Sequence, residues 1–479
     1  MTAAALKRVV IDHSDGDGPR TRTILSTGSL VLQGMVKLAL SIAVGRMMGP
    51  HALAQVTAAL AVASILSLLT PSAIGSAASR FLAATQAQGE PGPLRQVTGH
   101  LGRRLLQSCL LLAPLGVVYW VATGHGLADA LTIGLLTIGI GGYAFARGVH
   151  TGAQQVRRLV TWDLFVSMLG VVGTVGMAAL GFRPVTTLLP LAFGYLLITV
   201  ASWPPTAAGR PTIAAEMDHF IRWGTLGTVI SAGLMHLAML VAEARLEPDL
   251  AGSFAAALNL LSPAGLLATS LTMVLFPSIA AAFGRGDNAG ALRLTRTASD
   301  DLVFIMVALF GSLSILAPWV VTILWGERFV SAGVIFPILA LGPLSRAVSM
   351  PSVTSMSARD RDGIRHSATS TLMGFGLAVL IWLAAPGPAW VAVAAGFSAA
   401  MTFTAVQNIV RATRHDGHRW TPTWARFAFG VGSVLAVLVV RDQWSLGLMI
   451  TTFMTASWLV AWSAMNGRAV RHLLGRRAP

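Results

Sequence analysis

Lys37 and Arg346 are basic residues inside long apolar segments, and the chemistry open to them there is anion binding. Lys37 lies beyond the middle of its segment, close to Gln33 and Ser41. An ammonium group that faces lipid at this depth costs about 2.5 to 3.5 kcal/mol or more. We therefore expect Lys37 to face a polar interior and to line an anion-binding cavity. The alternatives are that it snorkels toward the outer interface or makes an internal contact between helices.

Two further candidates emerge when the chain is shifted along itself by 198 residues. Lys37 then falls on Met235, immediately before His236, so both halves present a basic or titratable group at a similar depth. Under the same shift Arg147 and Arg346 fall one residue apart. Guanidinium groups bind phosphate oxygens bidentately, so these arginines suit a phosphate-bearing ligand. The alternatives are arginines placed at the headgroups by topology, and a packed, hydrogen-bonded histidine at His236.

Arg46, Glu243 and Arg245 form a third group of candidates, at the outer ends of two apolar segments. Opposite charges at these ends could pair and close an outer gate. Exposed ion pairs at helix ends are also common without any such role.

Residue patterns that carry catalysis, metal ions or cofactors are not found. The chain contains no Gly-rich loop followed by Lys and Ser or Thr, no GxSxG and no histidine or acidic cluster with metal spacing. Cys109 is the only cysteine, which excludes a disulfide framework. Loops that are predicted to face outward are too short for a catalytic domain. We expect a protein that is not an enzyme and has no metal or cofactor.

Apolar segments of about 18 to 25 residues carry all these candidates, and a helix of about 20 residues crosses the hydrocarbon core of a bilayer. The chain is 54% hydrophobic and 11% charged, with a mean hydropathy of +0.69. The predicted fold is an all-α, polytopic integral membrane protein with about 14 transmembrane helices. We place them at residues 24–44, 52–71, 104–122, 127–147, 160–181, 186–203, 220–241, 250–276, 301–324, 330–350, 367–385, 389–410, 424–440 and 444–464.

Basic residues alternate between the two sides of this arrangement. Of the 34 lysines and arginines, 27 fall on one side and five on the other. The positive-inside rule then places both termini in the cytoplasm and the chain in the cell membrane. The net charge of +15 follows from this topology, so we expect the lipid bilayer and no nucleic acid as a partner.

The 198-residue shift also indicates an internal repeat. It lays Pro50–Leu60 on Pro248–Leu258, so the turn after the first helix matches the turn after the seventh. Parallel repeats of this kind occur in transporters, with the cargo site between the halves. The predicted parts are a cytoplasmic tail (1–23), an N-lobe of six helices (24–204), a cytoplasmic linker (205–219), a C-lobe of six helices (220–411), a helix pair (412–464) and a basic cytoplasmic tail (465–479).

Several segments resemble the polysaccharide-flippase branch of the multidrug/oligosaccharidyl-lipid/polysaccharide (MOP) exporter superfamily. In the first half they are Arg46–Leu69 (RMMGPHALAQVTAALAVASILSLL) and Ser79–Ala84 (SRFLAA). In the second half they are Leu275–Asp287 (LFPSIAAAFGRGD) and Ile323–Gly342 (ILWGERFVSAGVIFPILALG). The resemblance covers residues 24–460.

This resemblance implies two six-helix lobes around a V-shaped central cavity. It implies a flippase that moves an undecaprenyl-pyrophosphate-linked oligosaccharide from the cytoplasmic to the outer leaflet, for polysaccharide biosynthesis at the cell surface. Polysaccharide polymerase machinery is then an expected partner. Cationic cavity residues would meet the pyrophosphate, and Lys37, Arg147 and Arg346 fit by type and location, with His236 at a similar depth.

Three other functions remain open. A flippase for the peptidoglycan precursor lipid would need the same cationic residues for its phosphates and has the same number of helices. A cation-coupled multidrug exporter needs an intramembrane carboxylate, whereas the first predicted helix offers a lysine and no acid. A polytopic glycosyltransferase or polymerase generally needs a sizeable outer loop.

Overall fold

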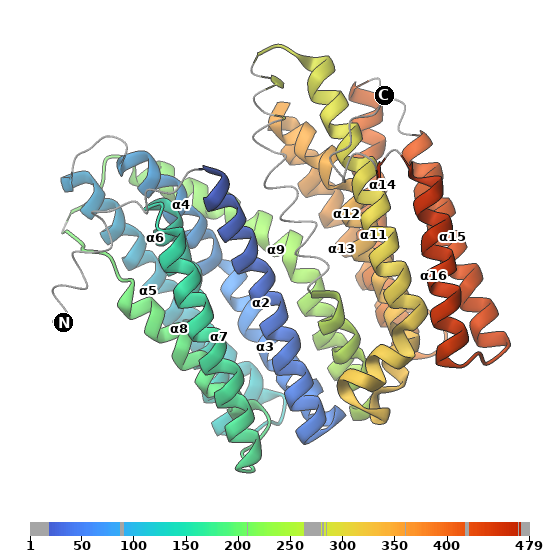
Figure 1. Ribbon diagram of the computed structural model, residues 1–479. Helices are drawn as coiled ribbons and strands as arrows, with labels where there is room; N and C mark the ends of the chain where they lie inside the picture. The colour runs from blue at the N-terminus through green and yellow to red at the C-terminus, as the bar shows by residue number, and fades with distance from the viewer. Residues whose placement is uncertain are drawn as a thin grey trace. The chain divides into compact units, whose positions relative to one another are not determined.

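The chain is helical throughout the part that the structure describes (Figure 1). This computed structural model describes residues 19–86, 91–207, 209–262, 279, 282–283, 285–359, 361–416, 421–467 and 469–470. Among these residues, 11 helices are long and apolar enough to cross a membrane, and no strand occurs. The prediction of an all-α, multi-pass membrane protein is therefore confirmed. Most of both predicted tails and the second half of the predicted helix 250–276 lie outside the described residues.

The helices form two compact units, Met1–Ala244 and Arg245–Pro479. In the first unit, Gly49 joins the first two helices with a φ of 88°, a conformation that a residue without a side chain adopts readily. The helices of this unit are α2 (Pro19–Met48), α3 (Pro50–Leu69), α4 (Pro71–Gln86), α5 (Pro91–Ala122), α6 (Leu127–Gly152), α7 (Val156–Ala179), the 3-10 helix η1 (Val185–Leu188), α8 (Leu189–Ala201) and α9 (Ala214–Arg245).

Helix α4 continues the chain beyond the apolar segment predicted at 52–71. The break after α3 falls at Pro71, whose ring lacks the N–H that would continue the preceding hydrogen-bond ladder. On α4 the apolar face is a stripe of small residues and Phe81, while serines occupy the other side, so its apolar run is too short to be recognised as a span. Gly75 of α4 meets Gly148 of α6 so closely that a methyl group on either would collide with backbone.

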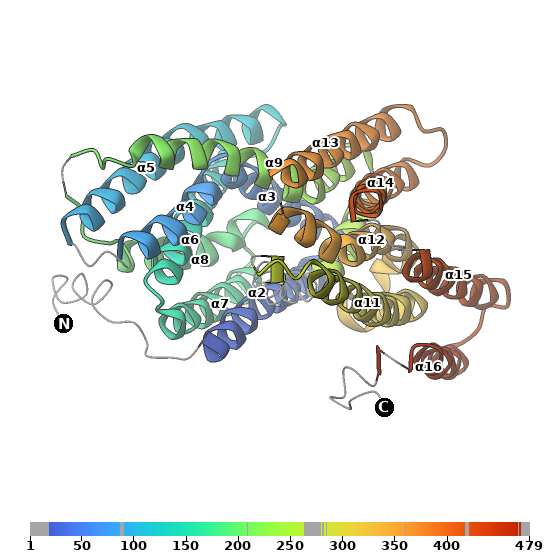
Figure 2. The same ribbon diagram turned by 90° about the horizontal axis from the view of Figure 1, so that it is seen from above.

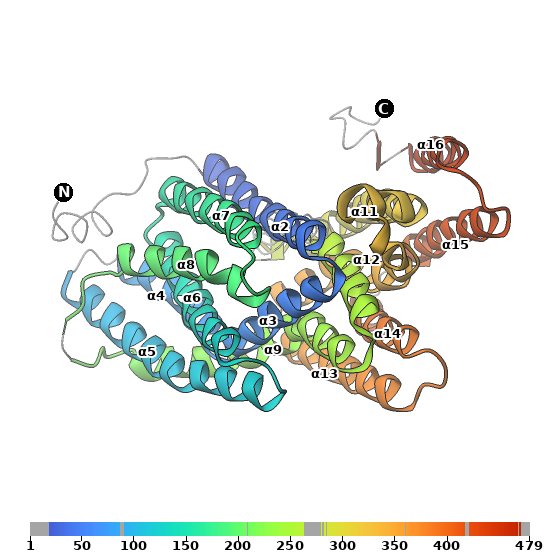
Figure 3. The ribbon, with the colours of Figure 1, turned by 90° about the horizontal axis from the view of Figure 1, so that it is seen from below.

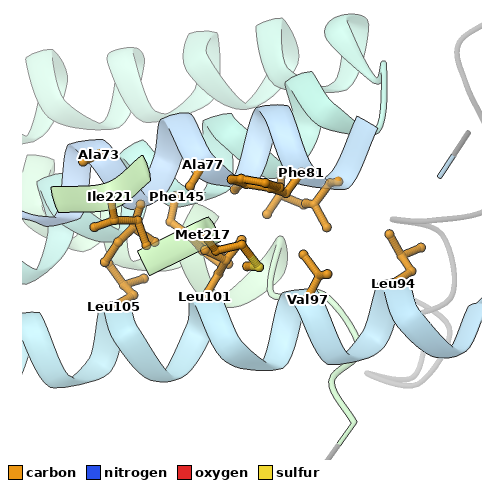
Figure 4. Packing of buried hydrophobic residues seen from close by; sticks show 14 of the residues in the cluster. Ala73, Ala77, Phe81, Leu94, Val97, Leu101, Leu105, Phe145, Met217 and Ile221 are labelled. Atoms are coloured by element: carbon orange, nitrogen blue, oxygen red, sulfur yellow. The ribbon is translucent and has the colours of Figure 1, made fainter. Parts of the chain in front are cut away.

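Buried apolar side chains join four helices of the first unit at one end (Figure 4). Ala73, Ala77 and Phe81 of α4 face Leu101 of α5 across this cluster, and Met217 of α9 packs between the two helices. Helix α9 begins at Ala214, inside the predicted linker 205–219, and the division between the compact units follows it.

The second unit contains helical residues 248–262, then α11 (Asn288–Trp325), the 3-10 helix η2 (Glu327–Phe329), α12 (Ser331–Arg359), α13 (Arg361–Ala384), α14 (Ala389–Asp416), α15 (Thr421–Gln443) and α16 (Leu448–Met465). Helix α12 contacts both α11 and α14 and forms the middle of this unit (Figure 2). Ser398 of α14 donates a hydrogen bond to a backbone carbonyl of α12, next to a close approach at Gly342.

The last two helices, α15 and α16, lie against α11 at the edge of the second unit (Figure 2). Trp458 and Trp462 of α16 stack with their rings nearly parallel, at 6.3 Å between centroids. Their indole nitrogens donate to Ser433 of α15 (3.0 Å) and to the Phe304 carbonyl of α11 (3.1 Å). Each buried indole N–H is thereby satisfied, which stabilises this helix pair against α11.

Candidate functional site

A polar stripe runs along α2, the first membrane helix. Ser29, Gln33, Lys37 and Ser41 follow one another at intervals of four residues, which places them on one face of the helix. Ser29 and Ser41 are buried, whereas Lys37 is exposed. Helix α2 packs along α7 (Figures 1 and 3), so this stripe can reach polar groups on the neighbouring helices of the first unit.

Asp163 of α7 is the acidic centre of the resulting network. The residue is 2% exposed, and its carboxylate accepts hydrogen bonds from Ser29 of α2 and from the Tyr143 hydroxyl of α6 (2.6 Å). Arg147 Nη1 lies 3.5 Å from Asp163 Oδ2 and forms an ion pair with it. A buried carboxylate is tolerated only when it is paired and hydrogen-bonded. These three partners supply both conditions.

Helix α6 positions two of the groups that face Asp163. Tyr143 and Arg147 are one helical turn apart, and Arg147 Nη1 also donates to the Tyr143 hydroxyl at 3.1 Å. Gln33 of α2 donates to the same hydroxyl. The Tyr143 ring packs against Tyr195 of α8 at 4.8 Å between centroids, so four helices meet around one phenol group. The arrangement can hold or relay a proton between an acid and a phenol, while the guanidinium group keeps its charge.

Lys37 and His236 are close enough for the charge of the ammonium group to act on the imidazole. Lys37 lies on α2 and His236 on α9, and both belong to the first unit. Among the described residues no carboxylate pairs with Lys37. Lys37 therefore supplies one positive charge, and the His236 imidazole of the same unit lies within reach of its field.

The remaining candidates from the sequence are distributed over both units. Arg346 belongs to α12 of the second unit and is half-buried. Arg147 has one-fifth of its side chain exposed beside its ion pair with Asp163. Glu243 lies 3.6 Å from His125, while Arg245 donates to the Trp382 carbonyl of α13. Arg46 is exposed at the end of α2.

Sequence reasoning missed Asp163, Tyr143 and His125. The signal for Asp163 was available, because an acidic residue inside the predicted helix 160–181 must find a partner within the membrane. Tyr143 carried no comparable signal, since a tyrosine in a membrane helix is unremarkable by composition. No group of three or more histidine, cysteine or acidic side chains suited to a metal ion occurs within the described part of the chain.

The fold and this polar interior define a class, the polytopic helical membrane proteins. No family model matches the chain, and no curated protein matches its sequence. Solved structures do match. One is described as "Lipid II flippase MurJ, inward closed conformation", with a TM-score of 0.70 and 13% identity over 94% of this chain and 99% of that one.

Two further matches are inward-facing and outward-facing conformations of a multidrug resistance MATE family transporter of the MOP superfamily. Their TM-scores are 0.66 and 0.57, at 15% and 14% identity. They cover 87% and 85% of this chain, and 98% and 99% of the matched chains. At these identities the likeness concerns the fold, and this chain has the fold of both kinds of transporter.

Proposed function

We propose that this chain is a membrane flippase that moves an undecaprenyl-pyrophosphate-linked oligosaccharide from the cytoplasmic to the outer leaflet by alternating access, for the biosynthesis of a cell-surface polysaccharide. The fold that it shares with a lipid II flippase and with multidrug transporters supports the transporter class. The choice of cargo within that class rests on the chemistry of the membrane interior.

Lys37 is the observation that carries the proposal. An exposed ammonium group beyond the middle of α2 is costly where it faces lipid, and a bound anion would offset that cost. It lies near His236 and has no carboxylate partner among the described residues, so its charge is available to a ligand. A pyrophosphate group supplies the matching negative charge, whereas a cationic drug would be repelled.

An apolar cavity in the second unit supports a cargo with a lipid tail. It has a volume of ≈ 210 Å³ and lies between α11, α12 and α15. Of the 13 residues that line it, Ser314 is the only one with a polar side chain, and Phe310, Leu344 and Leu438 are typical of the rest. A cavity with this lining suits a hydrocarbon chain.

The remaining parts of the proposal follow from topology and residue type. Arg147 and Arg346 would attract the phosphates near the cytoplasmic side, with both termini in the cytoplasm of a cell-membrane protein. The two six-helix lobes predicted from the 198-residue repeat would move against each other. Polysaccharide polymerase machinery would take over the cargo outside.

A second candidate function is a cation-coupled multidrug exporter, which is favoured by one specific observation. The intramembrane carboxylate that such a transporter needs is missing from α2 but present on α7, as Asp163. Its ion pair with Arg147 leaves little free negative charge for a cationic drug. We therefore place this candidate second. A peptidoglycan precursor flippase is a further alternative, and complementation of strains that lack each flippase would decide between the two flippase functions.

The decisive experiment replaces Lys37 by Gln and by Arg and follows labelled lipid-linked oligosaccharide in the cell membrane. A charge-assisted hydrogen bond contributes about 1.5 to 3 kcal/mol, which corresponds to about ten-fold or more in rate. We expect Lys37→Gln to lower export at least about ten-fold, with cargo retained in the inner leaflet, and Lys37→Arg to keep most of it.

Arg328→Gln is the matched control, because it removes one exposed positive charge from η2 outside the proposed cavity. All variants are compared at equal protein level. Undiminished export in Lys37→Gln would overturn the anionic cargo. Export of a cationic dye that depends on Asp163 would favour the multidrug exporter.

A further inference from the structure

Two histidine–carboxylate pairs link α9 to α5 and to the turn that follows α5. His100 Nε2 lies 2.9 Å from Asp218 Oδ1, and His125 Nε2 lies 3.6 Å from Glu243 Oε1. The partners in both pairs are 118 residues apart in the sequence, so the two helices run parallel in one register. Along a helix the 25 residues between the pairs span about 37 Å, more than the hydrocarbon core of about 30 Å. The two pairs therefore belong to opposite faces of the membrane.

The pair at the beginning of α9 has a second, permanent cation. Arg104 Nη2 and Nε lie 2.5 Å and 3.0 Å from the two oxygens of Asp218, a bidentate arrangement. Burial would by itself raise the pKa of Asp218, but hydrogen bonds from Arg104 and His100, and their charges, hold it below its ordinary value. Arginine does not lose its proton in the physiological range. Asp218 thus stays ionised and bound whether or not His100 is protonated.

Apolar packing reinforces the same end. Met217 and Ile221 of α9 lie against Leu101 and Leu105 of α5 (Figure 4). We call the group His100, Arg104 and Asp218, with this packing, the inner anchor.

The pair at the other end of α9 has no such support. At 3.6 Å the His125 and Glu243 side chains are too far apart for a hydrogen bond, so only charge attraction between them remains. The His125 ring stacks on Trp120 at 4.2 Å between centroids, and its Nδ1 lies 3.0 Å from the Thr123 hydroxyl. These contacts fix the ring, so that Nε2 faces the carboxylate of α9.

The charges around His125 leave one negative charge uncompensated when the imidazole is neutral. Glu243 on α9 and Asp129 on α6 supply two carboxylates, and Arg183, before η1, supplies one permanent cation that acts on Asp129. Tyr119 of α5 is the further titratable group near Glu243. Protonation of His125 completes the neutralisation, and imidazole is the side chain that changes charge between about pH 5 and 8.

We propose that His125 and Glu243 form an outer latch, which holds the outer end of α9 to the first unit only while His125 is protonated, whereas the inner anchor holds the other end at all physiological pH values. That the latch senses the pH outside the cell rests on the proposed function and its topology. Acid outside then keeps α9 with the first unit along its whole length. Loss of the proton releases its outer half from the turn that follows α5.

The experiment measures a distance in the purified full-length chain in nanodiscs, with Cys109→Ser as the background. Spin labels at Leu127 of α6 and Ala244 of α9, both exposed, report on the latch. Labels at the exposed residues Gln107 of α5 and Trp223 of α9 report on the anchor. We expect one short latch distance at pH 5 and a second, longer population at pH 8, with no change at the anchor.

Three variants make the result specific. His125→Gln and Glu243→Gln should show the longer population at both pH values, and His125→Lys, with a lasting charge, should suppress it at both. His51→Gln is the matched control, since it removes another exposed histidine near the outer end of α2, and should keep the wild-type response.

A latch distance that is the same at pH 5 and 8 in the wild type would overturn the proposal, as would a pH response that persists in His125→Gln. A distance at the inner anchor that changes with pH would show that the anchor does not hold α9 at all physiological pH values. Because the distances are measured without cargo, failure of the latch leaves the flippase proposal standing. Conversely, failure of the Lys37 experiment leaves the latch intact.

Discussion

Asp163 is buried in the membrane-spanning part of α7, where its neighbours supply hydrogen bonds and a compensating charge. Ser29 and Tyr143 donate hydrogen bonds to the carboxylate, and Arg147 supplies the compensating charge. Breaking a buried pair by removing one partner leaves an uncompensated charge, whereas removing both is often much less costly. The network therefore stabilises the protein only while both charged partners are present.

We predict that Asp163→Asn and Arg147→Gln each destabilise the protein by about 3 to 5 kcal/mol, as expected for a broken buried ion pair. The double variant should recover a large part of that loss, since no charge is then left alone. Thermal unfolding in detergent, followed by tryptophan fluorescence, measures all three. Additive effects in the double variant would mean that the pair is not coupled as the 3.5 Å distance indicates.

The candidate site was predictable in part from its residues. The 198-residue shift puts Lys37 and His236 at similar depth, and their role in one site stays a prediction. The network around Asp163 was not predicted, because it depends on the rotation of α6 and α7 about their axes. Apolar helices that are hydrophobic all round carry no periodic signal for that rotation.

Among the elements, α11 shows how a proline inside a helix creates a docking point for another helix. Pro318 cannot donate a hydrogen bond to the Ser314 carbonyl one turn earlier. Arg441 of α15, only 5% exposed, donates instead to the carbonyls of Ser314 (3.3 Å) and Ile315 (2.8 Å). A charged side chain from the last helix pair thus replaces the missing backbone donor and holds α15 against α11.

We predict that Arg441→Ala destabilises the protein by about 1.5 to 3 kcal/mol, the usual range for a hydrogen bond to a charged group. The loss should be smaller in a Pro318→Ala background, where the N–H of the alanine can satisfy the Ser314 carbonyl. Hydrogen exchange along α15, together with the thermal midpoint, measures the effect. Arg328→Ala serves as a surface control, and an equal loss with and without Pro318 would contradict the docking role.

At the scale of the whole molecule, the order of the helices was predicted better than their ends. Most predicted spans coincide with observed helices, because about 20 apolar residues in a row have few other structures open to them in a bilayer. The sequence did not predict α4 or the first turns of α5, α9 and α11, because these polar extensions project beyond the apolar runs. The lobe boundaries stay a prediction from the repeat, and α9 belongs by its contacts to the first compact unit.

The orientation of the chain, which both the cargo route and the outer latch assume, can be tested with single cysteines in the Cys109→Ser background. Thr212, before α9, and Gln443, at the end of α15, are exposed and lie at opposite ends of their units' helices by the charge pattern. A maleimide that cannot cross the membrane should label Gln443→Cys in intact cells and Thr212→Cys only after lysis. The reverse pattern would place the 27 basic residues outside, against the positive-inside rule, and would invert the proposed direction of transport.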